Sequence, residues 1–301
     1  MLYADPGKLS NAVRRTQGLL RYDALITPFD PTLEMEALGA SVVWGTEKEN
    51  DYAPPRLAEN SNANVTAQIS EDTSSFLRAG RIPVILEVVK RLKSFNVDRV
   101  PVFAYLTGPL TLACQILRSD PKSALVKDER KLDEVVDLEI NIVRSMCENG
   151  ITGLLVAEGD LSALDRRDLD SYERAISPIW NLVEYYQTKQ VLVVERGNRL
   201  AIDFARIVPH SVVVCDINLD DIETIAVITQ ELDKCLGLPL PAEILDRPKV
   251  VRAIMDKIRA GFQDSLRNLF VTTSSPMVMD LDVARAKESI EVVHNITSLP
   301  T

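Results

Sequence analysis

The stretch RVPVFAYLTGPLTLACQIL, residues 99–117, decides the fold class of this chain. Its apolar run at 100–106 is too short to cross a membrane and is rich in β-forming residues, so it predicts a buried strand. Thr107-Gly108-Pro109 ends that strand, and residues 110–117 are typical of a helix with Pro109 in its first turn. A strand that passes through a tight glycine turn directly into a helix is the repeating unit of parallel α/β proteins.

The same unit recurs along almost the whole chain, and no change of composition marks a linker. Strands are expected at 23–29, 100–106, 151–158, 190–196, 211–217 and 268–274, with a strand-like passage at 235–245. Seven or eight such units in 301 residues predict a single (β/α)8 TIM barrel of the α/β class over residues 1–301. We expect residues 1–22 to be a lead-in segment and residues 45–70 a long loop. The alternative is a doubly wound open sheet, which the lack of a GxGxxG after the first strand disfavours.

Composition excludes several classes of partner. The formal net charge is −10, so the chain lacks the basic footprint that nucleic acid or an anionic membrane surface requires. The four cysteines include no CxxC pair, which favours reduced thiols over a disulfide framework. No apolar run reaches the length of a signal-peptide core or a membrane span, so we expect a cytoplasmic protein. The sequence leaves the choice between a monomer and a homodimer open.

Acidic residues follow the predicted strands at the point where each strand ends. They are Asp30, Glu158, Asp160, Glu195 and Asp216. Because the carboxyl ends of parallel strands meet at one mouth of a barrel, we expect four strands to bring these carboxylates to one cleft. Crowded carboxylates raise one another's pKa, which suits a general acid or a site for a hard metal ion. The alternative is that Asp30 and Asp216 only cap the helices that follow them.

Seven residues are candidates for the site. The candidate catalytic residues are Asp30 and Glu158, and the candidate substrate-binding residues are Tyr105, Thr107, Glu195, Arg196 and Asp216. Tyr105 closes the central strand and can equally be a core residue with a solvated hydroxyl. Glu195 and Arg196 are adjacent on one strand, so one of the two points away from the barrel axis. Arg196 can bind a substrate carboxylate or pair with a neighbouring acid.

Three blocks of the sequence carry a family resemblance. They are TPFDPTLEMEALGASV (27–42), GRIPVILEVVKRLK (80–93) and PVFAYLTGPLTLACQI (101–116). These blocks resemble the uroporphyrinogen decarboxylase superfamily, which includes the decarboxylase and the corrinoid-dependent methyltransferases such as the methylcobalamin:coenzyme M branch. The likeness runs from about residue 22 to residue 295. It implies a (β/α)8 barrel, in agreement with the pattern of strands and helices.

The decarboxylase branch is matched at only one of its functional positions. Its essential aspartate falls on Asp30, in DALITPFD (23–30). Its tyrosine after the GxPxTLA block falls on Gln115, and its C-terminal histidine falls near Ser274, so both are replaced. No segment before Tyr22 matches the arginine-rich segment that holds the carboxylates of the porphyrinogen. The resemblance therefore argues against true porphyrinogen decarboxylation.

The methyltransferase branch is matched in its motif but not in its metal ligands. Residues 28–39 carry the PFD-x-T-x-E-x-EALG pattern of that branch almost verbatim. The branch binds zinc, which holds a thiol as its thiolate, through a His-x-Cys pair before Gly-Asn and a Cys on the last strand. The corresponding residues are Val194 and Arg196, before Gly197-Asn198, and a position within 272–275. All three ligands are missing, so the resemblance argues against a zinc site.

Three functions remain open. The first is a methyltransferase-like enzyme that acts on a small molecule with a corrinoid (methylcobalamin) protein or a small methyl donor. There Asp30 and Glu158 are the central polar groups and Tyr105 lines the pocket. The second is a decarboxylase-like lyase in which Asp30 stabilises a protonated pyrrole-type intermediate of a tetrapyrrole. The third is a catalytically silent barrel that binds a tetrapyrrole or acts as a scaffold. We expect no resident cofactor, and a metal only if Glu158, Glu195 and Asp216 form an oxygen-rich substitute site.

Overall fold

The computed structural model describes residues 1–45, 54–59, 73–96, 100–197, 200–208, 210–218, 222–262, 269–274 and 281–297. The strands are β1 (Leu25–Ile26), β2 (Val42–Val43), β3 (Arg56–Leu57), β4 (Val102–Thr107), β5 (Gly153–Asp160), β6 (Lys189–Arg196), β7 (Ser211–Val214), β8 (Cys235–Leu240) and β9 (Leu269–Thr273). The helices are α1 (Pro6–Leu20), α2 (Leu33–Ala37), α4 (Thr73–Phe76), α5 (Ile82–Asn96), α6 (Pro109–Leu117), α7 (Pro121–Lys127), α8 (Glu129–Glu148), α9 (Arg166–Tyr185), α10 (Ala201–Ile207), α11 (Ile222–Glu231), α12 (Pro248–Gly261) and α13 (Val283–Thr297), with a short 3-10 helix at Ala242–Ile244. Among these described helices, none combines the length and the apolarity that crossing a bilayer requires.

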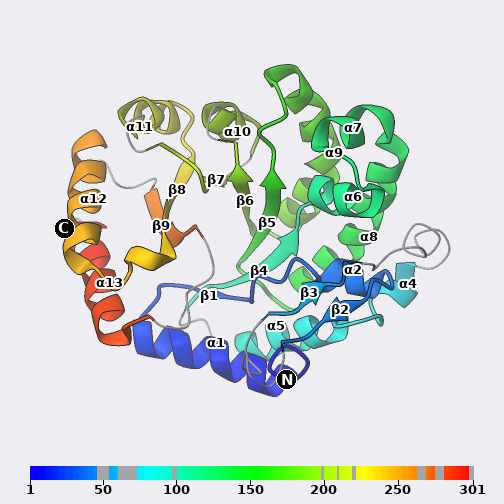
Figure 1. Cartoon of the computed structure of the whole chain (residues 1–301), viewed down its shortest axis with the longest axis horizontal. Coiled ribbons are helices and arrows are strands. Elements are labelled where there is room, and N and C mark those ends of the chain that lie inside the picture. The colour runs from blue at the N-terminus through cyan, green and yellow to red at the C-terminus, as the bar shows by residue number, and fades with distance from the viewer. Residues whose placement is uncertain are drawn as a thin grey trace.

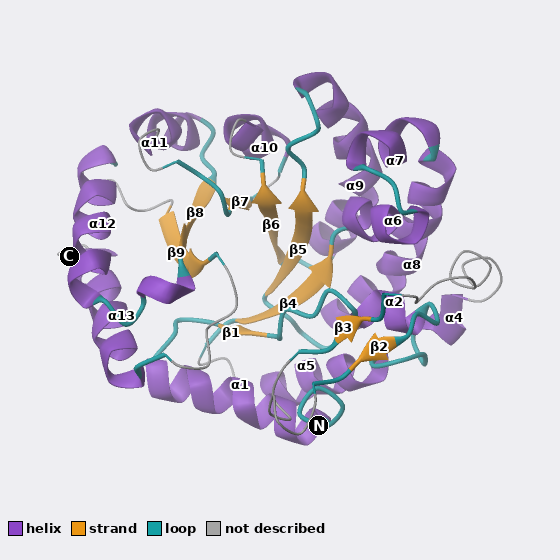
Figure 2. Cartoon of the chain, viewed as in Figure 1, coloured by secondary structure: helices purple, strands orange, loops and turns teal. Residues whose placement is uncertain are grey.

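Seven strands form one sheet in the order β1-β4-β5-β6-β7-β8-β9. Every neighbouring pair in this order is parallel. The order follows the sequence without a reversal, whereas a doubly wound sheet reverses its order at a switch point. The sheet is curled and helices surround it (Figure 2), so the fold is of the TIM-barrel class and the doubly wound alternative is wrong. Within the described residues, no pairing joins β9 to β1.

Side chains alternate between the inside of the curled sheet and its helix-covered outside. Leu155, Val191 and Val213, from three adjacent strands, form one cluster that side chains of β1, β4 and β9 also join. Strands this far apart in the sheet share a cluster only in the interior of a barrel. The intervening residues Leu154 and Val156 pack in the larger core beneath the helices. This alternation decides which strand-end side chains can reach the mouth of the barrel.

The lead-in segment forms helix α1, which packs against both α5 and α13 (Figure 1). Asp5 begins the helix by accepting hydrogen bonds from the backbone N–H groups of Gly7 and Lys8. At the other end, Leu20 packs in a cluster with Ala286 and with Ile290 of α13. Helix α1, the first of the described helices, therefore packs against α13, the last one.

Only a small part of the loop predicted at 45–70 lies within the described residues. Residues 56–57 form β3, which pairs antiparallel with β2, so the prediction is wrong at this point. Residues 46–53 and 60–70 of the predicted loop lie outside the described residues. The strand-like passage predicted at 235–245 is a regular parallel strand only as far as Leu240, and the 3-10 helix follows.

Gly153 provides a test of the packing inside the barrel. A Cβ atom on Gly153 would lie 2.1 Å from the ring of Phe103. Gly153→Ala therefore forces the ring aside, and we expect the free energy of unfolding to fall by about 1–3 kcal/mol. Gly18→Ala on α1 is the matched control, because nothing lies within 4 Å of the added methyl group. There we expect a gain of about 0.5–1 kcal/mol. Urea denaturation measures both, and equal stabilities of the two variants would contradict this packing.

Candidate functional site

Arg81, the residue before α5, holds the segment that follows β1. Its guanidinium pairs with the Asp30 carboxylate through Nη1 and donates through Nη2 to Oγ1 of Thr32 at 2.8 Å. Its Nε donates to Oε2 of Glu36 at 2.5 Å, and its Cζ lies 5.0 Å from the centre of the Trp44 ring. Arg81 and Asp30 are only 5% and 4% exposed. They therefore form a buried ion pair, in which each charge depends on the other for its stability.

Asp30 also fixes the turn between β1 and α2. Its Oδ1 accepts hydrogen bonds from the backbone N–H of Thr32 at 3.1 Å and from the Thr32 hydroxyl at 2.7 Å. Helix α2 begins at Leu33 with Thr32 as its N-cap, so the alternative that Asp30 is the cap is wrong. Contacts on both oxygens hold the carboxylate in one orientation before any ligand arrives.

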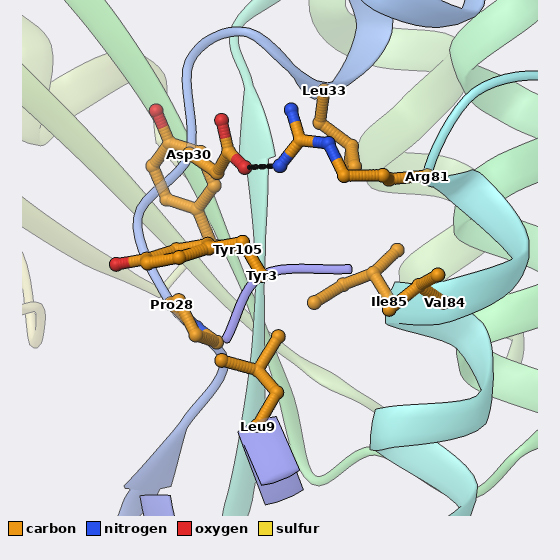
Figure 3. A pocket seen from close by; sticks show the side chains of 9 residues that line it. All are labelled: Tyr3, Leu9, Pro28, Asp30, Leu33, Arg81, Val84, Ile85 and Tyr105. Atoms are coloured by element: carbon orange, nitrogen blue, oxygen red, sulfur yellow. Dashed lines mark hydrogen bonds and ion pairs between the residues drawn. The ribbon is translucent and has the colours of Figure 1, made fainter. Parts of the chain in front are cut away.

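A small cavity adjoins Asp30 (Figure 3). Its lining residues are Tyr3, Leu9, Pro28, Asp30, Leu33, Arg81, Val84, Ile85 and Tyr105. Figure 3 shows the Asp30 carboxylate facing Arg81, with the two tyrosine rings near Asp30. The cavity volume is about 10 Å³, which is the room that one water molecule needs. A buried carboxylate and two phenols thus surround a water-sized space at the carboxyl ends of β1 and β4.

Tyr105 is both a core residue and part of the cavity wall. It packs in the core, 7% exposed, with its ring edge-on to Phe29 at 4.9 Å between centres, and it also lines the cavity. Burial raises the pKa of its hydroxyl, and the nearby carboxyl groups of Glu34 and Asp30 add to this effect. The hydroxyl therefore stays protonated and able to donate a hydrogen bond at neutral pH.

Thr107 points to a carboxyl group inside the protein. Its Oγ1 donates to Oε2 of Glu34 at 2.7 Å, and its backbone N–H donates to Oε1 at 3.2 Å. Both residues are at most 1% exposed, so the side chain of Thr107, a candidate for substrate binding, is engaged by a buried carboxyl group. Burial raises the pKa of Glu34 to about 7, although the hydrogen bonds from Thr107 act in the opposite direction.

Glu158 anchors the first turn of helix α6. Its carboxyl oxygens accept hydrogen bonds from the backbone N–H groups of Leu110 at 3.2 Å and Thr111 at 2.8 Å, and from the Thr111 hydroxyl. The Tyr172 hydroxyl on α9 donates a further hydrogen bond at 3.2 Å. Gly108 is required here, because a Cβ atom at this position would lie 2.2 Å from the carboxyl carbon of Glu158. These contacts satisfy N–H groups that a helix cannot pair internally.

The prediction that Glu158 points into the mouth is therefore wrong. Side chains alternate along β5, so Leu155 and Gly159 lie on the barrel side, whereas Val156 and Glu158 lie on the helix side. Glu158 is 2% exposed, and burial raises its pKa. Its geometry is that of a structural anchor between the sheet and two helices.

Glu139 on α8 is a third buried carboxyl group, whose pKa responds to both Glu34 and Glu158. It is fully buried, and within the described residues neither of its carboxyl oxygens has a hydrogen-bond partner. Burial, reinforced by those two neighbouring acids, raises its pKa well above the ordinary value, which keeps it protonated at neutral pH. Sequence reasoning missed Glu139, although its place on the same helix face as Val135 and Ile142 was a usable signal.

Glu195 and Arg196 lie on opposite faces at the end of β6, as their adjacency predicts. Nη2 of Arg196 pairs with Oδ2 of Asp160 at 3.0 Å, its direct neighbour across β5 and β6. Of the two alternatives for Arg196, the structure thus shows the pairing with an acid. Glu195 is exposed, and its Oε2 lies 3.8 Å from where a Cβ atom on Gly159 would be.

Asp216 and the other strand-end acids do not gather around one centre. Asp216 is exposed and accepts a hydrogen bond from the backbone N–H of Gly197 at 3.0 Å, which joins the loops after β6 and β7. In the part of the chain that the structure describes, no three His, Cys, Asp or Glu side chains are grouped as a metal ion would require. Glu158, Glu195 and Asp216 therefore do not form the conjectured substitute site. Val194, at one of the positions where the resembled methyltransferase branch binds zinc, is buried among apolar side chains, so a zinc centre of that kind does not fit this chain.

Comparison with known proteins identifies a family profile that matches nearly the whole chain and curated relatives that match about half of it. The profile of the uroporphyrinogen decarboxylase (URO-D) family matches residues 2–295. The methylcobamide:CoM methyltransferase MtbA of Methanosarcina mazei is 26% identical over 160 residues, which are 52% of this chain and 46% of that protein. MtbA of Methanosarcina acetivorans is 23% identical over 160 residues, with the same coverage of both chains. The chain thus matches about half the length of these curated relatives.

Two solved structures resemble the fold. A methyltransferase from Methanosarcina mazei aligns with a TM-score of 0.73 and 16% identity, over 99% of this chain and 87% of that one. A B12-independent methionine synthase from Shewanella sp. W3-18-1, in complex with selenomethionine, aligns with a TM-score of 0.59 and 11% identity, over 96% of this chain and 87% of that one. At such identities the likeness shows a shared fold and does not by itself show a shared reaction.

The buried pair of Asp30 and Arg81 predicts a large effect on stability. Asp30→Asn leaves the guanidinium buried without one of its partners, so we expect the free energy of unfolding to fall by about 3–5 kcal/mol. Arg196→Gln breaks the exposed pair with Asp160 and is the matched control, with an expected loss of less than about 1 kcal/mol. Urea denaturation compares the two variants. Equal losses would contradict the buried pair.

The raised pKa of Glu34 predicts how stability changes with pH. Its pKa is about 7 in the folded chain against an ordinary value of 4.5, so the folded chain binds this proton more tightly than the unfolded chain. The contribution of this group to stability is therefore greatest below pH 4.5 and is lost as the pH rises to about 7, a change on the order of 3 kcal/mol. Glu34→Gln should make the fall in stability across this range shallower. Denaturation at several pH values measures it, and an unchanged slope would contradict the raised pKa.

Proposed function

The chain belongs to the uroporphyrinogen decarboxylase (URO-D) family, and on this premise we propose that it is an enzyme that transfers a methyl group to or from a small molecule. The curated relatives that support this proposal are methylcobamide:CoM methyltransferases, and the match to them covers half of the chain. One observation of the structure carries it further. The polar residues of the motif that resembles the methyltransferase branch, at 28–39, all have buried partners, and Asp30 among them adjoins a cavity at the carboxyl ends of the strands.

The residues around the cavity suit orientation of a substrate better than acid–base chemistry. Arg81 and Thr32 hold the Asp30 carboxylate as a fixed hydrogen-bond acceptor, and Tyr105, which stays protonated and able to donate, lines the same cavity. Methyl transfer depends mainly on the alignment of donor and acceptor, which such fixed groups supply. Because the cavity holds about one water molecule, a larger substrate has to displace lining side chains, so binding is coupled to a conformational change.

The methyl donor in this proposal is a corrinoid carried by a partner protein, or else a small methyl compound. The word methylcobamide in the name of the relatives supports the first of these two donors. A methylated corrinoid would supply the methyl group, and the residues of this chain would bind and orient the acceptor. No step involves zinc, because the residues at the positions where the resembled methyltransferase branch binds zinc do not fit it.

Of the functional residues of the decarboxylase branch, this chain matches only the essential aspartate, at Asp30. Gln115, at the position of that branch's tyrosine, lies on α6 and lines a different pocket from the one beside Asp30. The two groups that a decarboxylase would combine are therefore apart in this chain, and we do not propose decarboxylation.

Incubation of the full chain with methylcobalamin and a thiol or tetrahydrofolate acceptor tests the proposal through the change in corrinoid absorbance. We expect demethylation that requires both the protein and the acceptor. In Asp30→Asn, kept at a temperature where circular dichroism shows it folded, the rate should fall by roughly a hundredfold. Glu184→Gln, an exposed change at the end of α9, is the control and should retain the rate. Absence of demethylation with every acceptor would favour the silent barrel, and full turnover in Asp30→Asn would refute the role of Asp30.

A further inference from the structure

A second pocket lies at the carboxyl end of β5, beside α6 and the start of α7. Its walls are Thr111, Cys114 and Gln115 of α6, Pro121 of α7, and residues 159–161. Its volume is about 270 Å³, far larger than the cavity beside Asp30. The carboxyl ends of strands are where barrels of this class bind their ligands. The pocket is therefore large enough and suitably placed for a small molecule.

Gly159 is part of the wall of this pocket and has no side chain to occupy its space. A Cβ atom on Gly159 would make only ordinary contacts, at 3.7 Å from Oγ1 of Thr111 and 3.8 Å from Oε2 of Glu195. Glu195 thus lies beside the pocket, on the strand next to β5. Leu161 and Pro121 add apolar surface. The pocket combines an apolar wall with a charged edge.

The charges at this edge sum to one negative charge. Asp160 lines the pocket, Glu195 borders it, and Arg196 pairs with Asp160. Hydrogen bonds from Ser162 hold the pKa of Asp160 below its usual range, so it is a carboxylate at neutral pH. The side chains of Arg196 and Asp160 are 60% and 40% exposed, so water screens this pair and a ligand can compete for it.

The Cys114 thiol in the wall of the pocket carries no charge at neutral pH. Burial raises the pKa of the Cys114 thiol to about 12, and the nearby Glu158 adds to this effect. Burial also raises the pKa of Glu158, which lies behind Thr111. The charge that a ligand meets comes from Asp160, Glu195 and Arg196, together with the carboxyl group of Asp120, which also acts on Cys114.

We propose that this pocket binds a small monocationic amine, with one ammonium group and a short apolar substituent. The ammonium group neutralises the residual negative charge at this edge, and the substituent packs on Leu161 and Pro121. An anion would instead meet two carboxylates and a guanidinium that is already paired. The site stands on its own geometry, so it is tested by binding and does not depend on methyl transfer.

Isothermal titration calorimetry of the full chain tests the charge preference with three probes of equal length. They are n-propylammonium chloride, 1-propanol and sodium propionate, compared at constant ionic strength. We expect saturable binding of propylammonium, at least about tenfold weaker binding of propanol, and no binding of propionate. Tighter binding of propionate, or no saturable binding of propylammonium, would overturn the proposal.

Single substitutions then locate the site. Glu195→Gln should weaken propylammonium binding by about tenfold, and Arg196→Gln should strengthen it, because it removes the competing cation. Glu184→Gln at the opposite end of the barrel, near His210, is the matched control and should leave the affinity unchanged. Gly159→Ala narrows the pocket without a clash and should weaken binding in a chain whose thermal unfolding is normal. Unchanged affinity in Glu195→Gln, or weaker binding in Arg196→Gln, would contradict the assignment.

Discussion

Two buried carboxyl groups, Glu34 and Glu158, hold the turn between β4 and α6 from opposite ends. Glu34 accepts both hydrogen bonds of Thr107, and Glu158 accepts N–H groups from the first turn of α6 together with the Thr111 hydroxyl. Helix N-termini carry unpaired N–H groups and a partial positive charge, which carboxyl oxygens satisfy. Near this turn lie the cavity beside Asp30 and the larger pocket at the end of β5, so its position affects the shape of both.

The three sequence blocks that resemble the URO-D family meet in one buried network. Arg81, from the second block, binds Asp30 and Glu36 of the first block. Glu34, also from the first block, binds Thr107 of the third. The resemblance therefore reflects residues that are far apart in the sequence but fasten the same edge of the barrel. Most of these polar groups support the site from within, and among them Asp30 and Arg81 line the cavity.

The sequence was sufficient to predict the barrel fold, but it did not predict which way the acidic side chains at the strand ends point. The spacing of hydrophobic residues and the turn residues predicted where the strands lie. The order of the strands in the sheet confirmed the TIM-barrel class. The predicted third strand stopped at Glu158, whereas β5 continues to Asp160. Alternation from Leu155, which faces the barrel interior, directs Glu158 toward the helices. Arg81 escaped prediction because its partner Asp30 lies 51 residues away, a contact that no local pattern encodes. Tyr3 was missed for a similar reason, since only folding brings the lead-in segment to the cavity.

Hydrogen exchange at the backbone amides of Leu110 and Thr111 is the most direct test of the carboxyl anchor. It compares the natural chain with Glu158→Leu, which keeps the bulk of the side chain but removes both acceptor oxygens. If Glu158 holds the turn, these two amides exchange much faster in the variant, while the amides of β6 are unchanged. Equal exchange at Leu110 and Thr111 in the two chains would contradict the anchor and with it the arrangement of both pockets.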